Sequence, residues 1–540
     1  MISRFLLRRS VLVPALFFAA FLTVGLAISG DFGVYWDEPA QIHLGTMVYR
    51  YIVKGDTELL THIDRYHGLW YETVMSYLQY HPDPRQIHLI RRRVNFLAFF
   101  AGVLAFFWLG CRVFRDWKAG LSGASLLIIS PRIFADAFYN TNDFPFLISF
   151  IFAMLSLSWV VQRQNIFTLS IHAFITAAAI TCRAAGTFII FFTALALLFL
   201  GFQRLKAAGE NFAKPKEVVL PLLGWSAFYG LSTLVFVVAL WPSLWHNPLV
   251  ELVAALREAG KFDWGGTVLY LGQDVSAASL PWHYLPVWIG ISTPPIYLLA
   301  MAVGSVIALK TLAAPGRRPL ITRAGAGIAL AWFFVPSLTA IGLRAVIFDS
   351  WRHMFFIYPG LILLAVAGLR GLGRWFASRL GARRKVGWAL VAGAVALTLL
   401  PVVDFMVRYH PTQNLYFNGF AAPENLLKEP QTLFGMPDMQ VVRGRFETDY
   451  YGLTYRPLLE ELLRRDSSPV ISIYPAQYVG RHAYLILPES ERRRLQYDGD
   501  ETATYFLTNY RGHPQDYPFP DEVFSYWVGN AKMATVFRLR

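Results

Sequence analysis

Two adjacent carboxylates follow the first long apolar run of this chain, within Tyr35-Trp36-Asp37-Glu38-Pro39. Such a pair can take a proton from a hydroxyl group or hold a divalent cation through oxygen ligands. Because proline suits the first turn of a helix, Asp37 and Glu38 are expected at the N-terminal end of a helix. A helix cap beside a solvated acid would give the same pattern, so the residues alone leave both interpretations open.

A third candidate carboxylate, Asp143, lies in a loop of about five residues between two apolar runs. A short hairpin would hold this carboxylate at the membrane boundary, where burying it without a partner would be costly. Such an acid is more often functional than an ordinary surface acid. Asn and Asp also favour turns, and a polar turn fits the same residues.

Several basic residues are predicted on the same side of the membrane as these acids. They are Arg183, the adjacent Arg352 and His353, and Arg92 in the run from Arg91 to Arg93. Cationic groups at headgroup level can hold a lipid phosphate by charge-assisted hydrogen bonds. The alternative is that these side chains only extend to the membrane interface.

Other polar residues are expected to be structural. Arg132 and Asp136 are one helical turn apart, so they are expected to pair across one helix face. The histidines of residues 30–93 do not show the spacing of a zinc motif on one helix, and they are expected on the polar surface. These histidines are His43, His62, His67, His81 and His88. The sequence does not identify a metal, and binding of a divalent cation at the acid pair is an open alternative.

The elements that must position these residues are predicted to be membrane-spanning helices. The 540 residues are 55% hydrophobic and 16% charged, and apolar runs of near 20 residues recur. This composition predicts a polytopic α-helical membrane protein. Eleven spans are predicted, at 11–28, 94–114, 119–138, 144–161, 166–181, 187–202, 218–240, 285–312, 324–343, 354–369 and 386–403.

The positive charge of the chain belongs to its membrane part. The formal charge is +14, yet residues 404–540 hold 15 Lys and Arg against 17 Asp and Glu. Basic residues in short loops set orientation by remaining on the cytoplasmic side. The charge therefore gives no reason to expect a nucleic-acid partner.

We expect two domains. Residues 1–403 form the transmembrane part, with external loops at 30–93 and 241–284, and residues 404–540 form a small extracytoplasmic α/β domain. In the second domain a helix is predicted at 458–465, and strands are predicted at 470–474, 483–487, 504–508 and 533–539. The N-terminus is expected in the cytoplasm. Its first apolar run is expected to be a retained anchor, although a small-residue cleavage site near residue 29 would also fit a signal peptide.

Several motifs together resemble the bacterial branch of glycosyltransferase family 39, which is related to the protein O-mannosyltransferases and aminoarabinose transferases of the GT-C class. The resemblance covers nearly the whole chain. It is carried by YWDEP at 35–39, SPRIFADAFYN at 130–140, DFPF at 143–146, WP at 241–242, LPWHYLP at 280–286, RH at 352–353 before YP at 358–359, and YYGL at 450–453.

The resemblance implies a membrane glycosyltransferase of the bacterial inner membrane. Such an enzyme uses a polyprenyl-phosphate-linked sugar and transfers it with inversion on the extracytoplasmic face to a lipid, glycan or protein hydroxyl of the envelope. It further implies that Asp37 is the catalytic base and that Glu38 and Asp143 shape the site. Arg352 becomes a candidate for the donor phosphate, and Arg183 is a further candidate.

Two other function classes compete with this one. A polytopic lipid or sugar flippase or transporter would also be basic on its cytoplasmic side, but it predicts ionisable residues near the middle of spans and repeat symmetry between halves. No repeat is detected here, and the notable acids lie at span ends. A non-catalytic scaffold in envelope assembly is the third possibility, and it would not depend on Asp37.

Overall fold

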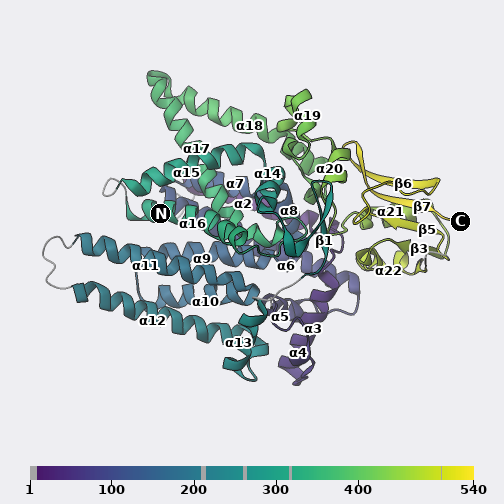
Figure 1. Cartoon of the computed structure of the whole chain (residues 1–540), viewed down its shortest axis with the longest axis horizontal. Coiled ribbons are helices and arrows are strands. Elements are labelled where there is room, and N and C mark those ends of the chain that lie inside the picture. The colour runs from purple at the N-terminus through teal and green to yellow at the C-terminus, as the bar shows by residue number, and fades with distance from the viewer. Residues whose placement is uncertain (1–8, 68, 208–214, 260–263, 315–318, 500–501) are drawn as a thin grey trace.

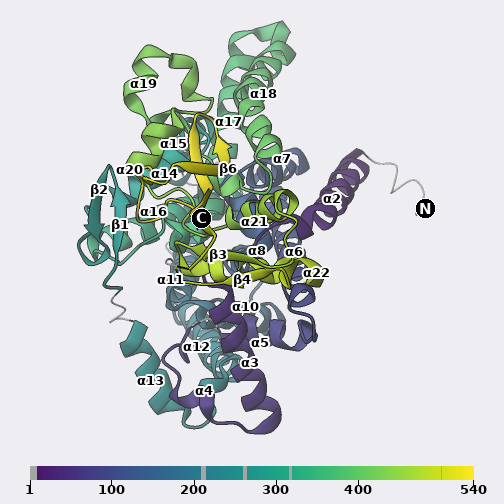
Figure 2. The same ribbon diagram turned by 90° about the vertical axis from the view of Figure 1, so that its right-hand side faces the viewer.

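The computed structural model describes every residue except 1–8, 68, 208–214, 260–263, 315–318 and 500–501. A bundle of long helices fills most of the molecule, and a small sheet domain lies at one end of it (Figure 1). Figure 2 looks onto that end, with the sheet in front of the helices. We call it the sheet end of the bundle.

Apolar helices of membrane-spanning length form the bundle. Within the described residues, nine helices are long and apolar enough to cross a membrane, or ten if one bent pair is counted as a span. The nine are α2 (Arg9–Ile28), α6 (Pro84–Phe114), α9 (Phe144–Gln162), α11 (Thr187–Ala207), α12 (Pro215–Leu240), α15 (Pro295–Ala313), α16 (Leu320–Gly342), α17 (Tyr358–Arg379) and α18 (Arg384–Arg408). The protein is therefore a multi-pass membrane protein.

The two remaining predicted spans are also helical, but neither is a straight helix of full length. Residues 166–181 lie in α10 (Ile166–Cys182), whose 17 residues are short for a span. Residues 119–138 form α7 (Trp117–Ile128) and α8 (Pro131–Tyr139), which are bent by 73°. Pro131 explains the break, because the residue before a proline is pushed out of the helical conformation. All nine residues of α8 are buried.

A second predicted span is also interrupted. Residues 285–312 form α14 (Tyr284–Ser292) and α15, separated by Thr293 and Pro294. Thr293, which precedes Pro294, is extended with φ −104° and ψ 136°. This again fits the restriction that proline places on the residue before it.

The two predicted loops contain short helices at the sheet end. Residues 30–93 form α3 (Glu38–Lys54), α4 (Glu58–Thr61) and α5 (Leu69–Leu78). Helix α6 begins ten residues before the predicted start at 94, so the three consecutive arginines lie inside a helix rather than in a loop. The second loop contains α13 (Pro248–Ala259) and the antiparallel strands β1 (Thr267–Tyr270) and β2 (Gln273–Ser276).

The C-terminal part contains a mixed five-stranded sheet in the order β4-β3-β5-β7-β6. Its strands are β3 (Ile471–Pro475), β4 (Leu495–Tyr497), β5 (Tyr505–Thr508), β6 (Asp521–Val528) and β7 (Ala531–Arg538), and its helices are α19 (Pro423–Lys428), α20 (Met439–Arg445), α21 (Tyr455–Arg465) and α22 (Glu489–Arg492). Strand β3 pairs in parallel with β4 and β5, whereas β7 pairs antiparallel with β5 and β6.

The predictions for this part were correct for one helix and three strands. The strand predicted at 483–487 is wrong, because Ala483–Ile486 forms a 3-10 helix. A short apolar run does not distinguish a buried strand from a buried helical turn. Strands β4 and β6 had no prediction.

The C-terminal part shares a core with the bundle. Phe417 and Tyr451 belong to the same buried hydrophobic cluster as Phe32 and Tyr139. A second cluster lies between α21 and the sheet and includes Leu458, Leu462 and Ile473. Residues near 450 are thereby fixed against the bundle.

Candidate active site

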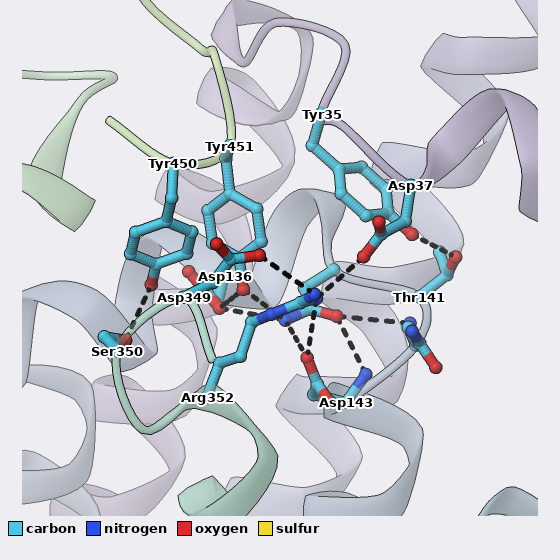
Figure 3. Close-up of polar contacts among 12 residues, drawn as sticks. Tyr35, Asp37, Asp136, Thr141, Asp143, Asp349, Ser350, Arg352, Tyr450 and Tyr451 are labelled. Carbon is cyan, nitrogen blue, oxygen red and sulfur yellow. Dashed lines mark hydrogen bonds and ion pairs between the residues drawn. The ribbon is translucent and has the colours of Figure 1, made fainter. Parts of the chain in front are cut away.

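A cluster of charged side chains joins Asp37, Asp143, Asp349 and Arg352, with Tyr450 and Tyr451 of the C-terminal part beside them (Figure 3). Asp37 comes from the residue before α3, Asp143 from the residue before α9, and Arg352 from the segment that leads into α17. These three elements are far apart in sequence, and Arg352 contacts both carboxylates.

Asp37 is the most accessible carboxylate of this cluster. Arg352 Nη1 donates to Asp37 Oδ2 at 2.7 Å, and the Asp37 side chain is 23% exposed. Its carboxylate makes no capping bond to the backbone of α3. The helix-cap alternative for Asp37 is therefore not what the contacts show.

Arg352 lies among three carboxylates while being 4% exposed. Besides Asp37, its Nη1 lies 3.4 Å from Asp143 Oδ2 and its Nη2 lies 3.3 Å from Asp349 Oδ2. Asp349 and Ser350 both have positive φ, at 53° and 66°. Two consecutive left-handed residues other than glycine are uncommon, although Asp tolerates this conformation better than most, so the surrounding contacts must hold this turn just before Arg352.

Asp143 is buried and pairs with cations on two sides. Its carboxylate accepts from Arg183 at Oδ1 and lies beside Arg352 at Oδ2, and its backbone N–H donates to Asn140 Oδ1 at 2.8 Å. Burial opposes ionisation of Asp143, but Arg183, Arg352 and the nearby His353 outweigh burial and lower its pKa to about 2. Asp143 is therefore a fixed negative charge at neutral pH.

Tyr451 from the C-terminal part contacts residues next to this cluster. The Tyr451 hydroxyl donates to Asp136 Oδ2 at 2.7 Å and accepts from Asn140 Nδ2 at 2.7 Å. Asp136 also accepts from Tyr139 at 2.6 Å. The guanidinium of Arg352 lies 5.7 Å from the centre of the Tyr451 ring.

The predicted pairing of Arg132 with Asp136 is wrong. Arg132 Nε donates to the Tyr416 carbonyl oxygen at 3.1 Å, and its guanidinium lies 4.5 Å from the Phe417 ring. The two side chains belong to the same short helix, α8, but they contact different neighbours. Tertiary contacts compete with a pairing that helix spacing alone permits.

Glu38 and Arg92 form a separate, closed cluster. Arg92 contacts both oxygens of Glu38, at 2.6 and 2.7 Å, and its Nη2 also donates to the Gly33 carbonyl oxygen at 2.5 Å. His88 Nδ1 lies 3.0 Å from Glu38 Oε1. Burial opposes ionisation of Glu38, yet Arg92 and His88 prevail and lower its pKa. His88 is 2% exposed, so the prediction of a surface histidine is wrong for it.

Arg91 and Glu72 belong to the same closed cluster. Arg91 Nη2 donates to Glu72 Oε1 at 2.8 Å and to Thr141 Oγ1 at 2.7 Å. The Thr141 hydroxyl also meets the Tyr35 hydroxyl at 3.1 Å. Arg91 and Arg92, which were predicted in the external loop 30–93, are therefore buried side chains of α6.

The predicted candidates thus separate into two groups. Asp37, Asp143, Arg183 and Arg352 come together, with His353 beside them. Glu38 and Arg92 contact each other instead. Sequence reasoning missed Asp349 as a member of the site, although it lies only three residues before the candidate Arg352.

The residues of the site offer proton transfer and electrostatic stabilisation. Asp37 is a partly exposed carboxylate that contacts the cation Arg352. Asp143 contacts both Arg352 and the second cation, Arg183. Cations fixed beside a developing negative charge stabilise it without rearranging. In the part of the chain that the structure describes, no group of three or more His, Cys, Asp or Glu side chains is placed to hold a metal ion.

Comparisons with known proteins give similarity at the level of structure. No protein-family model matches the chain, and no curated protein sequence matches it. Two crystal structures of ArnT from Cupriavidus metallidurans are similar to it over 97% of both chains. The apo structure is 14% identical with a TM-score of 0.47, and the structure bound to undecaprenyl phosphate is 13% identical with a TM-score of 0.43.

Proposed function

We propose that this protein is a membrane glycosyltransferase of the GT-C type. It moves a sugar from a polyprenyl-phosphate donor to a hydroxyl group of an envelope lipid, glycan or protein. The motif resemblance to glycosyltransferase family 39 supports this reaction class. The observation that carries the proposal is the partly exposed Asp37 carboxylate beside the Arg352 guanidinium at the end of a membrane-spanning bundle.

The proposed roles follow from the positions of the charges. Asp37 takes the proton of the acceptor hydroxyl while its oxygen attacks the anomeric carbon. The bond between that carbon and the phosphate oxygen breaks, and polyprenyl phosphate leaves with the electron pair. Attack from the side opposite the leaving group gives inversion.

The cations assist the departing phosphate. Arg352 and Arg183 are the proposed phosphate-binding residues, and His353 lies beside them. Asp143 holds both guanidinium groups, because each lies within ion-pair distance of its carboxylate. Arg92 is left out of this role, since its terminal nitrogens already contact Glu38 and Gly33.

A lipid-linked substrate fits the location of the site. A polyprenyl tail must stay in the bilayer while its phosphate reaches polar groups, and both conditions are met where apolar helices end beside buried arginines. We propose that the sheet end is extracytoplasmic and that the membrane is the bacterial inner membrane. The rule that cytoplasmic loops are rich in Lys and Arg supports this orientation, because residues 370–385 hold six basic residues and no acidic ones.

The test is transfer of radiolabelled sugar from a panel of polyprenyl-phosphate sugars to envelope acceptors. Membranes carrying the wild type, Asp37→Asn and the control Asp31→Asn are compared. Asp31 is a suitable control because its side chain is 50% exposed and contacts His410 instead of the site. We expect Asp37→Asn to lose about 10²–10⁴-fold in rate, as loss of a general base does.

The control is expected to keep wild-type activity. Wild-type activity in Asp37→Asn would overturn the role of Asp37. If no donor supports transfer by the wild type, yet the wild type and Asp37→Asn bind polyprenyl phosphate equally, the transferase is overturned and a lipid flippase or transporter is favoured.

A further inference from the structure

The segment that carries Asp37 lies directly against the C-terminal part of the chain. A Cβ atom at Gly33 would lie 3.2 Å from Arg456 Cβ and 3.2 Å from the Leu453 carbonyl oxygen. Arg456 Nη1 donates to the carbonyl oxygens of Gly30, at 2.6 Å, and Phe32, at 3.2 Å. The backbone leading to Asp37 is therefore held by residues more than 400 positions away.

Arg511 extends this contact to the side chains of the site. It follows β5, and its side chain is 13% exposed. Its Nη2 donates to Asp349 Oδ1 at 2.7 Å, and its Nη1 donates to the Tyr450 carbonyl oxygen at 2.5 Å. Its guanidinium lies 4.3 Å from the centre of the Trp36 ring.

These contacts place Arg511 between the two main groups of the proposed mechanism. Trp36 is the residue directly before Asp37. Asp349 accepts from Arg511 at one oxygen and from Arg352 at the other. One guanidinium thus contacts the neighbour of the proposed base and the carboxylate that holds the proposed phosphate-binding arginine.

The chemistry of arginine suits such a role. The planar guanidinium stacks on an aromatic ring and donates in fixed directions at its edge, which a lysine ammonium cannot do at once. The contact with Asp349 is charge-assisted and largely buried, so it is stronger than a bond between neutral groups. Displacing reacting groups by about 1 Å can cost about 10²-fold in rate.

We propose that Arg511 is a positioning residue that fixes Trp36 and Asp349 and thereby sets the arrangement of Asp37 and Arg352. The inference rests on the proposed glycosyltransferase function and assigns a role to the C-terminal part within it. The sheet domain is then needed for turnover itself, beyond any recognition of the acceptor.

The test uses the full-length protein with Arg511→Met, Arg511→Lys and Asp349→Asn. Arg464→Met is the matched control, because Arg464 lies in the same part of the chain, is 70% exposed and contacts Glu461 on its own helix. We expect Arg511→Met to lower kcat about 10–100-fold with a smaller change in the KM for the donor. Arg511→Lys should recover part of the loss, and Arg464→Met should match the wild type.

A double-mutant cycle tests the route through Asp349. If Arg511 acts through this carboxylate, the double variant should lose less kcat than the product of the two single-variant fold losses, those of Arg511→Met and Asp349→Asn. Fully multiplicative losses would overturn that route. If Arg511→Met lowers the thermal unfolding temperature of the whole protein, and the folded fraction keeps the wild-type kcat, Arg511 has a merely structural role.

Hydrogen exchange separates this inference from the proposed function. In Arg511→Met, amides of residues 30–37 and 349–352 should exchange faster than in the wild type and in Arg464→Met. Faster exchange in these segments, with no transfer by any form of the protein, would uphold the positioning contact and reject the transferase. Unchanged exchange together with unchanged kcat would overturn the positioning role.

Discussion

Asp37 and Glu38 are neighbours in sequence, yet they belong to two very different charged clusters. The open cluster joins Asp37, Asp143, Asp349, Arg183 and Arg352, and Asp37 in it is 23% exposed. The closed cluster joins Glu38, Glu72, His88, Arg91 and Arg92, and Glu38 in it is 0% exposed. The difference shows that two adjacent acids can belong to separate clusters, one partly exposed and one buried.

Helix geometry explains this division. Consecutive residues at a helix start point about 100° apart around its axis, because a helix has about 3.6 residues per turn. The first turn of α3 therefore turns Asp37 toward Arg352 and Glu38 toward α6. In the closed cluster each oxygen of Glu38 contacts a cation, and no surface is left for a substrate.

The largest expected effect follows from changing Glu38, which tests whether the closed cluster is structural. Glu38→Gln leaves the buried Arg92 without its anion, so we expect the unfolding free energy to fall by about 3–5 kcal/mol, as for a broken buried ion pair. Asp37→Asn should lower the unfolding free energy by less than Glu38→Gln does, because Asp37 is partly exposed and Arg352 keeps Asp143 and Asp349 as anions. Thermal unfolding in detergent, read beside the transfer rate, measures both effects.

The comparison fails if Glu38→Gln folds like the wild type and loses transfer as Asp37→Asn does. Glu38 would then belong to the reacting groups, and its burial would need another explanation. Normal folding with normal transfer would show instead that the closed cluster contributes little to stability.

Lysine substitutions of one arginine in each cluster should have smaller effects and should separate loss of transfer from loss of stability. Arg183→Lys keeps a charge near Asp143 but loses the directed donors, and we expect transfer to fall about 10-fold, equivalent to one charge-assisted hydrogen bond. Arg92→Lys loses its double contact with Glu38, and we expect lower stability with little change in kcat of the folded fraction. Steady-state rates normalised to folded protein distinguish these results from the reverse pattern, which would exchange the roles of the clusters.

A separate effect concerns pH and a further carboxyl beside the open cluster. Burial raises the pKa of Glu447 to about 8, Arg511 opposes the rise, and Asp349 adds to it. Folded protein therefore keeps a proton that the unfolded chain releases near its ordinary value of 4.5. The stability from this proton is present below 4.5 and is lost as pH rises toward 8, with a slope of at most about 1.4 kcal/mol per pH unit.

Glu447→Gln should remove this part of the pH dependence. We expect its thermal unfolding temperature to fall less than that of the wild type between pH 5 and pH 8. Parallel curves for the two proteins would show that Glu447 does not hold the proton. Glu38 in the closed cluster is already ionised across this pH range, because Arg92 and His88 lower its pKa. Glu38→Gln should therefore leave the slope of stability against pH between 5 and 8 unchanged.

Much of the fold could be predicted because it depends on local composition. Every apolar run that we predicted as a span is helical, since a run of apolar residues favours burial in lipid whatever its neighbours are. The bend before Pro131 and the separation of α14 from α15 were missed, although both have a local signal in proline. Strand β4 has only three residues, too few to show an alternating pattern.

The candidate site was predictable in its residues and less so in its contacts. The types and positions of Asp37, Asp143, Arg183 and Arg352 suggested one site, and the structure brings these side chains together. The link from Asp349 to Arg511 spans 162 positions, and no spacing rule connects residues so far apart.

The sequence by itself determined the membrane class, the helical runs and the residue types available for proton transfer and anion binding. These depend on composition and on short-range periodicity, which each segment carries alone. Only the tertiary structure decided that Asp37 faces the site while Glu38 is sealed against Arg92, and that Arg511 reaches Asp349. The rotation of a helix about its axis and the meeting of distant segments are set by packing against the rest of the chain, and that information is not local to any segment.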